Sequence, residues 1–428
     1  MDSIIELDRL YDLFSKHSTI TTDSRNCPAG SIFFALKGEK FNGNLFAKET
    51  IEKGCAYAIV DEPGIADNQR IFFVENTLKT LQQLARKHRE TLGTPIIGVT
   101  GTNGKTTTKE LTAAVLKQKF NLLYTQGNLN NHIGVPMTLL QLKKEHQVAI
   151  IEMGANHPGE IKTLVNIAEP NFGVITNVGK AHIAGFGSFE GVIRTKCELY
   201  DFLKDHNGTA FVNQANEILS REAANRSLNT IPYGQGSNTT AEILSSGPYL
   251  IIRWRGHEIH TQLIGRYNFE NVLAAIAVGL KFEVNEADIV TALESYTPTN
   301  NRSQFKKTEK NELIIDAYNA NPTSMNASLD NFLQINHGNK TVILGDMKEL
   351  GTESETEHQK IADKLSASDL TEIFLVGENF AKTNCAKAKK FDNVTLLNQY
   401  LEQSPLTGRL VLIKGSNSMK LVDCLPFV

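Results

Sequence analysis

A lysine and a threonine follow a glycine-containing loop at residues 99–108, which spell VTGTNGKTTT. An apolar run at 95–99 precedes the loop and predicts a buried strand, and the helix-forming residues after it predict a helix. Such a loop presents backbone N–H groups and a helix N-terminus to phosphate oxygens. Lys105 would reach the terminal phosphates, and the Thr106 hydroxyl would ligate Mg2+. The pattern therefore predicts a nucleotide site.

The loop departs from the usual Walker pattern at one position, because Val99 stands where that pattern has a glycine, five residues before Gly104. It is the G-T-N-G-K-T variety, which is tighter than the loop of motor ATPases. A chance Gly-Lys-Thr in a turn is the alternative, and the flanking strand and helix argue against it. The residues that we expect at the phosphates are Gly101, Thr102, Asn103, Gly104, Lys105, Thr106 and Thr107.

Polar residues follow other predicted strands within 94–298, where strands and helices alternate. This alternation predicts a mainly parallel sheet that binds ligands at the carboxyl ends of its strands. Glu152 directly follows an apolar run, where nucleotide enzymes keep a carboxylate for Mg2+. His182 follows the strand-like run that begins at Phe172, and Lys196 lies in a predicted helix. Each alone is usually solvated surface, but their convergence on the edge that carries the phosphate loop favours a functional site.

Three further polar segments are candidate substrate contacts. Residues 128–136, NLNNHIGVP, would lie beside the nucleotide and could meet a second substrate, although Asn-rich turns are commonly structural. Residues 265–280 predict a helix with Asn268 and Asn271 in its first turns. One of these asparagines would cap the helix, and the other could contact the edge of a nucleotide base. Residues 22–25, TDSR, combine hydroxyls with a guanidinium that suits a phosphate or a uracil edge, or they form only a turn.

The composition bounds the class of protein. The 428 residues suffice for two or three domains, and 44 Lys plus Arg against 47 Asp plus Glu leave no basic field for nucleic acid. Five scattered cysteines without a CxxC spacing favour a reducing compartment and argue against disulfides or a zinc site. The N-terminus is acidic where a signal peptide is basic, and no apolar run approaches membrane length. We therefore expect a cytoplasmic protein, a monomer, with neither membrane nor nucleic acid as partner.

Changes of pattern divide the chain into three predicted domains. Residues 1–93 contain short apolar runs between polar loops and close with an amphipathic helix, which predicts a small α/β domain. Residues 94–298 form the predicted nucleotide domain. Residues 299–428 repeat strand-then-polar-loop units with helices between them, which predicts a second doubly wound α/β domain without a phosphate loop or a GxGxxG. Two such domains suggest a cleft that closes on bound substrate.

Motifs spread over residues 22–419 resemble those of the Mur ligases, the ATP-dependent amide-forming enzymes of peptidoglycan synthesis. In chain order they are TDSR, GTNGKTT, GNLNNHIGVP, IEMGA, NVGKAHIAGFGS, KCELY, YNFENVLAA, DAYNANPTSM, LGDMKELG and KGSNSM. The resemblance implies a three-domain Mur ligase architecture: a central P-loop parallel-sheet ATPase domain, a small N-terminal α/β domain that binds a UDP-sugar, and a C-terminal Rossmann-like domain. Departures from the family pattern are Cys197 for Gly, Asn417 for Arg, and residues 41–44 for D-G-H.

Within the family, DAYNANP followed by LGDMKELG and KGS is most similar to members that join D-alanyl-D-alanine to UDP-N-acetylmuramoyl-tripeptide. The resemblance implies an ADP-forming ligase that works through an acyl phosphate, with ATP and two Mg2+ ions. The sequence is compatible with either lysine or diaminopimelate as the third residue of the tripeptide.

The resemblance also implies roles for individual residues. Catalysis falls to Lys105, His182, Lys196 and Arg302. The metal ligands are Thr106, Glu152, His182 and Lys196, the last carrying CO2 as a carbamate. Nucleotide contacts beyond the loop are Asn271 at the adenine, Arg302 at the terminal phosphate and Asp316 at the ribose. The sugar nucleotide would meet Ser24 and Arg25 at its UDP end and Asn130 and Asn131 near its muramoyl side. The dipeptide would contact Asn319, Asn321, Asp346 and Lys414.

Three alternatives compete with this interpretation. Another ligase of the superfamily, either the one adding the third residue or folylpolyglutamate synthase, is disfavoured by the NANP and LGDMKELG stretches and by the missing D-N-P-R motif. An ATP-dependent motor or switch is disfavoured by Val99 and by a second α/β domain without an Arg-rich, oligomer-facing segment. A catalytically silent binding protein is disfavoured because every expected catalytic position is occupied.

Overall fold

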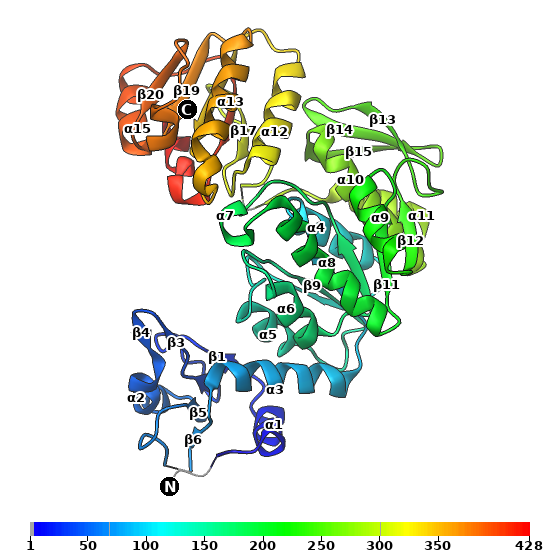
Figure 1. Ribbon diagram of the computed structural model, residues 1–428, viewed down its shortest axis with the longest axis vertical. Helices are drawn as coiled ribbons and strands as arrows, with labels where there is room; N and C mark the ends of the chain where they lie inside the picture. Colours follow the sequence, from blue (N-terminus) through cyan, green and yellow to red (C-terminus); the bar gives the residue numbers. More distant parts are fainter. Residues whose placement is uncertain (1–3, 68, 300) are drawn as a thin grey trace.

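The computed structural model describes residues 4–67, 69–299 and 301–428, and it contains three bodies in chain order (Figure 1). We call them the N-terminal, central and C-terminal bodies, after the main sheet that each contains. In Figure 1 the N-terminal body lies at the bottom, the C-terminal body at the top, and the central body joins them. The expected three-part α/β architecture is thus confirmed.

The N-terminal body is built on a short parallel sheet in the order β1-β2-β5-β6. Its strands are β1 (Ile20–Thr21), β2 (Ile32–Phe34), β5 (Tyr57–Val60) and β6 (Ile71–Phe73), with a hairpin of β3 (Lys37–Gly38) and β4 (Phe41–Asn42). Its helices are α1 (Leu7–Lys16), α2 (Ala47–Glu52) and α3 (Thr77–Leu92). The predicted closing helix, α3, starts where the Asn76 side chain accepts a hydrogen bond from Lys79 N–H, and it stops at Gly93 in the left-handed conformation.

The central body contains a six-stranded sheet in the order β12-β11-β10-β7-β9-β8, with every neighbouring pair parallel. The strands are β7 (Ile96–Thr100), β8 (Leu122–Tyr124), β9 (Val148–Glu152), β10 (Phe172–Ile175), β11 (Thr209–Asn213) and β12 (Asn229–Tyr233). The helices are α4 (Lys105–Leu116), α5 (Gly134–Leu139), α6 (Glu160–Ala168), α7 (Ile183–Phe186), α8 (Phe189–Asp205), α9 (Glu217–Asn225), α10 (Phe269–Lys281) and α11 (Glu286–Ser295). The apolar strands β7 and β9 are buried along their whole length, as expected for a parallel sheet covered on both faces.

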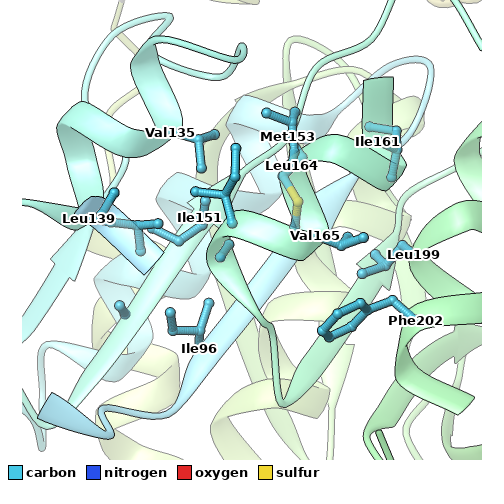
Figure 2. Close-up of a cluster of buried hydrophobic side chains, with 14 of the residues drawn as sticks. Ile96, Val135, Leu139, Ile151, Met153, Ile161, Leu164, Val165, Leu199 and Phe202 are labelled. Carbon is cyan, nitrogen blue, oxygen red and sulfur yellow. The ribbon is translucent and has the colours of Figure 1, made fainter. Parts of the chain in front are cut away.

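One apolar core joins the central body to the N-terminal body. On one face of the central sheet, side chains from β7, β9, α5, α6 and α8 pack together (Figure 2). Buried residues of α1 and α3, including Phe14 and Leu84, belong to the same cluster. The other face has a separate core with α4 and α10. The N-terminal body therefore shares buried apolar surface with the centre.

A three-stranded antiparallel sheet, β13 (Glu242–Ser245), β14 (Tyr249–Trp254) and β15 (His257–Ile264), was not expected within a mainly parallel segment. Exposed and buried positions alternate along β15, which is the period of a half-buried strand. Arg255 and Gly256, both at positive φ, close the hairpin between β14 and β15. The helix that was expected after the phosphate loop, α4, begins at Lys105 and ends at Leu116, where the chain tightens into turns.

The C-terminal body holds a second six-stranded sheet in the order β16-β17-β21-β18-β19-β20, in which only the edge pair β16–β17 is antiparallel. Its strands are β16 (Gln304–Lys307), β17 (Glu312–Asp316), β18 (Lys340–Gly345), β19 (Glu372–Val376), β20 (Ala388–Phe391) and β21 (Leu410–Lys414). Its helices are α12 (Pro322–Gln334), α13 (Ser354–Ala367), α14 (Glu378–Ala381) and α15 (Val394–Gln403). Separate apolar clusters cover the two faces of this sheet. Over the part of the chain that the structure describes, helices are too short or too polar to cross a bilayer.

The shared core gives a testable prediction at Leu164, a residue of α6 that is 1% exposed and is drawn in Figure 2. We expect Leu164→Ala to lower the free energy of unfolding by about 2–5 kcal/mol, because it leaves a cavity in a packed core. Leu45→Ala, at a side chain that is 73% exposed, should change it by less than about 0.5 kcal/mol. Denaturant titration of both variants measures the difference, and equal effects would contradict the assignment of the core.

Candidate active site

The phosphate loop connects β7 to α4 with backbone that approaches its neighbours too closely for side chains. A Cβ at Gly101 would lie 2.1 Å from Thr176 Oγ1, and one at Gly104 would lie 2.5 Å from Asn271 Oδ1. Gly104 also has a φ of +79°, which favours glycine. These two glycines fix the loop between the ends of β7 and β10 and the first turn of α10.

Lys105 is folded over this loop, where its Nζ donates to Gly101 O at 2.8 Å and to Thr102 O at 3.0 Å. Burial lowers the pKa of Lys105 to about 8; the Glu152 carboxylate opposes this shift and the Arg302 guanidinium adds to it. A lysine that is held by two carbonyls can exchange them for phosphate oxygens, which are stronger acceptors. The sequence-based assignment of Lys105 to a phosphate site therefore agrees with its surroundings.

A cavity of about 1240 Å³ opens in front of the loop, and all three bodies line it. The expected site residues along its wall are Thr102, Asn103, Gly104, Lys105, Thr106, Thr107, Asn130, Asn131, Glu152, His182, Asn271, Arg302, Asp316, Asn319 and Lys414. The N-terminal body contributes Leu78 and Gln82 of α3. The carboxyl ends of the central strands and those of β17 and β21 thus face one space.

Glu152, at the end of β9, has one carboxylate oxygen engaged and one free. Its Oε1 accepts from Asn130 Nδ2 at 2.8 Å and from Thr106 Oγ1 at 3.2 Å. Its Oε2 is buried and, among the described residues, has no hydrogen-bond partner. A buried carboxylate oxygen without a partner is costly unless a cation binds it, and Mg2+ prefers oxygen ligands of this kind. Thr106 and Glu152 therefore fit a Mg2+ site.

His182 lines the same cavity as Glu152. His182 precedes α7 in the left-handed conformation, several residues beyond the end of β10, and its Nδ1 contacts Glu349 Oε2 of the C-terminal body. Burial lowers the pKa of His182, an effect that Glu349 opposes. The expectation that His182 directly follows a strand is thus wrong in detail, because β10 stops at Ile175.

Lys196 lies on α8, as predicted, but its side chain is only 2% exposed. The helix starts where Ser188 Oγ accepts from Gly191 N–H, and Lys196 Nζ donates to Ala155 O at 3.3 Å. Burial, with a smaller contribution from the charge of Lys105, lowers the pKa of Lys196 to about 7. Lys196 is not among the residues that line the cavity wall. It is a buried amine with a large neutral fraction near pH 7, the reverse of a solvated surface lysine.

The opposite wall carries an arginine and an ion pair from the C-terminal body. The Arg302 guanidinium lies over the Tyr318 ring at 3.7 Å, and among the described residues its buried Nε has no partner. Lys414 Nζ donates to Asp316 Oδ2 at 2.6 Å, at the paired ends of β21 and β17. Arg302, a residue of the cavity wall, thus has one buried donor without a partner among the described residues, whereas Asp316 and Lys414 neutralise each other.

A pair of asparagines joins the phosphate loop to the C-terminal body. Asn321 Nδ2 donates to Asn103 Oδ1 at 2.7 Å, and Asn103 Nδ2 lies 3.4 Å from Asn321 Oδ1. Asn321 also caps α12, where its Oδ1 accepts from Ser324 N–H. Nearby, Lys180 of the central body pairs with Glu353 at 3.3 Å. Asn321 was expected at a dipeptide, and its observed contacts are with the loop and its own helix.

Asn271 presents little of its amide to the cavity. Its Oδ1 accepts from Thr108 Oγ1 at 3.0 Å, and its Nδ2 donates to Asn268 Oδ1 at 2.9 Å. Asn319 caps its own turn, with its Oδ1 accepting from Ala320 N–H. The amide of Asn271 therefore positions the phosphate loop.

Besides Asn321, three expected substrate residues are absent from the cavity wall. Asp346 is fully buried, and its carboxylate accepts from the backbone N–H of Asn379 and Phe380, so instead of the expected contact with a dipeptide it holds the start of α14. Ser24 and Arg25 belong to the N-terminal body, where the exposed Arg25 side chain pairs with Asp23 at 2.9 Å. The structure does not bring these three residues to the phosphate loop.

The comparisons with known proteins agree with this architecture. Family models match residues 16–89 (Mur ligase family, catalytic domain), 99–279 (Mur ligase middle domain) and 301–417 (Mur ligase, glutamate ligase domain). A UDP-N-acetylmuramoyl-tripeptide–D-alanyl-D-alanine ligase of Bacillus subtilis is 34% identical over 421 residues, covering 94% of this chain and 91% of that protein. The Escherichia coli protein of the same name is 34% identical over 422 residues, covering 94% and 92%.

Solved structures give the same result. MurF from Acinetobacter baumannii superimposes with a TM-score of 0.85 at 34% identity, covering 95% of this chain and 92% of that one. MurF ligase from Thermotoga maritima, in complex with ADP, has a TM-score of 0.86 at 26% identity and covers 97% of each chain. A phosphate loop that opens into a cavity lined by all three bodies is typical of a nucleotide-dependent enzyme. The matches extend along nearly the whole chain, and this chain therefore belongs to the Mur ligase family.

The crowding at Gly104 gives a prediction for nucleotide binding. We expect Gly104→Ala to weaken ADP binding by about tenfold or more, because a side chain at positive φ costs about 1–3 kcal/mol and its Cβ would displace Asn271. Gly408→Ala is the matched control, since Gly408 also has a positive φ but faces open space. Titration calorimetry with ADP separates the two, and unchanged ADP affinity in Gly104→Ala would contradict the loop assignment.

Proposed function

We propose that this chain is the ATP-dependent ligase that joins D-alanyl-D-alanine to UDP-N-acetylmuramoyl-tripeptide in peptidoglycan precursor synthesis. The observation that carries the proposal is a cavity with a phosphate loop on one wall and the strand ends of a second α/β body on the other. Relatives more than 30% identical over nearly their full length carry the name of this activity. The expected cytoplasmic location and monomeric state stay predictions.

The chemistry explains why two walls are needed. A carboxylate is a poor acyl donor until one of its oxygens becomes part of a leaving group. ATP would transfer its terminal phosphoryl group to the tripeptide carboxylate, forming an acyl phosphate and ADP. The dipeptide amine would then attack the acyl carbon, forming the amide bond and releasing inorganic phosphate. Water must be kept away from the acyl phosphate, which a closed cavity between bodies achieves.

Cationic groups must hold two anionic reactants together, and this chain has them on both walls. Lys105 would exchange its carbonyl partners for the transferring phosphate, and Arg302, whose buried Nε has no partner among the described residues, would meet the terminal phosphate. Thr106 and Glu152 would hold a Mg2+ ion, which neutralises phosphate charge when it is bound. Backbone N–H groups of residues 101–107 would bind the other phosphate oxygens.

The remaining substrate contacts are proposed from position. Asp316 at the ribose and Asn271 near the adenine are supported by their place on the cavity wall. Asn130 and Asn131 face the same space and suit the muramoyl side, while Ser24 and Arg25 would meet the UDP end. Asn319 and Lys414 remain the proposed dipeptide contacts, with Asp346 and Asn321 acting through the loops that they hold. We place the domain boundaries at 93/94 and 298/299.

A second Mg2+ ion would require His182 together with a carbamate on Lys196. The low pKa of Lys196, about 7, supports this because CO2 reacts only with the neutral amine. Above pH 7 the neutral form dominates, so carbamate formation should rise as the pH rises through about 7. An unmodified ammonium has no lone pair for a metal, whereas a carbamate has two oxygens.

The activity itself is the first test. Phosphate release from ATP should require both UDP-N-acetylmuramoyl-tripeptide and D-alanyl-D-alanine, and mass spectrometry should identify the pentapeptide product. We expect Lys105→Ala to lower the rate about a hundredfold or more, because no other loop side chain can neutralise the transferring phosphate. The exposed Lys117→Ala serves as the control. ATP turnover that ignores the dipeptide would refute the proposed function.

The carbamate gives a separate prediction. Lys196→Arg should be as inactive as Lys196→Ala, although it preserves the positive charge, because a guanidinium cannot be carbamylated. A short carboxylic acid added to Lys196→Ala should restore part of the rate by supplying the missing oxygen. If Lys196→Arg keeps most of the wild-type rate, the position supplies charge and the carbamate is wrong.

A further inference from the structure

Lys109, one helical turn after Lys105 on α4, is a buried lysine that the proposed reaction does not use. Its side chain has no exposed surface, and its Nζ lies 2.7 Å from Glu110 Oε1. Lysine is almost never fully buried unless it is paired. Replacing a buried ion pair by apolar side chains is often neutral or stabilising, so folding alone gives a weak reason for a charge at this position.

The second contact of Lys109 points toward the site. Its Nζ donates to the backbone carbonyl of Thr125 at 2.6 Å. Thr125 is the residue directly after β8; it is fully buried, and its N–H donates to Ile150 O at 3.0 Å. The Thr125 hydroxyl accepts the backbone N–H of Glu152 at 2.9 Å. One residue therefore separates the Lys109 ammonium from the backbone of Glu152.

The loop that starts at Thr125 returns to the same carboxylate. Asn130, near the end of this loop, donates its Nδ2 to Glu152 Oε1 at 2.8 Å, and its carbonyl accepts from Gly154 N–H at 2.8 Å. Glu152 is thus held at its backbone by the first residue of the loop and at its side chain by a later one. Lys109 holds the loop where it leaves the sheet.

We propose that Lys109 is a positioning residue for Glu152: it fixes the loop 125–131 so that Oε1 of Glu152 is occupied by protein donors and Oε2 stays free for a divalent cation. A lysine suits the task because its long side chain reaches from α4 to the end of β8, where the ammonium donates to a carbonyl. The ammonium also lies beside the Glu110 carboxylate and 5.5 Å from the centroid of the Tyr124 ring. The inference rests on the proposed function, since the cation is the one that accompanies the nucleotide.

The test measures cation binding without turnover. Mn2+ binding to the enzyme in the presence of ADP is followed by loss of the free Mn2+ electron paramagnetic resonance signal, and ADP binding in EDTA is measured by calorimetry. In Lys109→Met we expect Mn2+ affinity to fall about tenfold or more, as for other residues that orient a metal ligand. ADP affinity in EDTA should change less than twofold, and the thermal midpoint should stay close to that of the wild type.

Two further variants make the result specific. Lys117→Met removes the exposed lysine of the same segment, whose Nζ lies 3.1 Å from the Tyr124 hydroxyl, and it should match the wild type. Thr125→Val removes the acceptor for Glu152 N–H and should weaken Mn2+ binding as Lys109→Met does. The double variant should be no weaker than the singles, because the two residues act in series.

Wild-type Mn2+ affinity in Lys109→Met would overturn the proposal, and so would an equal loss of ADP binding in EDTA, which would indicate a general disturbance. If Lys109→Met does not fold, Thr125→Val decides alone, and normal Mn2+ affinity in that variant overturns the proposal. Failure of the wild-type enzyme to bind Mn2+ with ADP would instead refute the proposed function.

Discussion

The site depends on two parallel sheets that present the carboxyl ends of their strands to one space. Each sheet orients its polar loops outward from those ends, and a single sheet would leave its ligand open to water. The ends of β7 and β9 bring Lys105 and Glu152, while the ends of β17 and β21 bring Asp316 and Lys414. Protection of a water-sensitive intermediate would thus depend on how the two sheets meet around the cavity.

Electrostatics around the cavity follow from burial. Lys196 and Lys414 are almost wholly removed from water and Lys105 is partly exposed. Burial lowers the pKa of Lys105 and of Lys196, because it disfavours the charged form of an amine. The cations are held by carbonyls or a single acid, and these partners can be exchanged for phosphate or carboxylate oxygens of a ligand. Glu152 has the opposite deficit, one carboxylate oxygen without a donor. Anionic substrates would pair with the lysines, and a divalent cation would pair with the free oxygen of Glu152.

The sequence predicts the parts of the site that rest on local patterns. The phosphate loop, Glu152 at a strand end and Lys196 on a helix follow from residue types and spacing over about ten residues, and the structure has them on those elements. The antiparallel strands β13 to β15 were missed because parallel-sheet patterns dominated the segment, although the alternation along β15 was a usable signal.

Contacts between distant segments could not be predicted in this way. Asn103 and Asn321 are 218 residues apart in the sequence, and nothing local to either identifies its partner. The same holds for the contact of His182 with Glu349 and for the hydrogen bond of Lys109 to Thr125. Asp346 shows the converse. Its motif suggested a substrate contact, but the carboxylate is buried and accepts hydrogen bonds from backbone N–H groups. The residue type shows that this side chain is polar, but only its place in the packed structure shows which groups it binds.

Apolar and polar contacts are distributed differently along the two seams of the molecule. The N-terminal body is joined to the centre through a common apolar core, so separating them would expose apolar surface to water. The C-terminal body also shares buried apolar residues with the antiparallel sheet β13 to β15, Ile264 among them, but beside the phosphate loop its contacts are amides and charges, such as Asn321 with Asn103 and Glu353 with Lys180. Water can solvate these polar groups when they part. The C-terminal seam would therefore open at lower cost beside the phosphate loop than at Ile264, where opening would expose apolar surface.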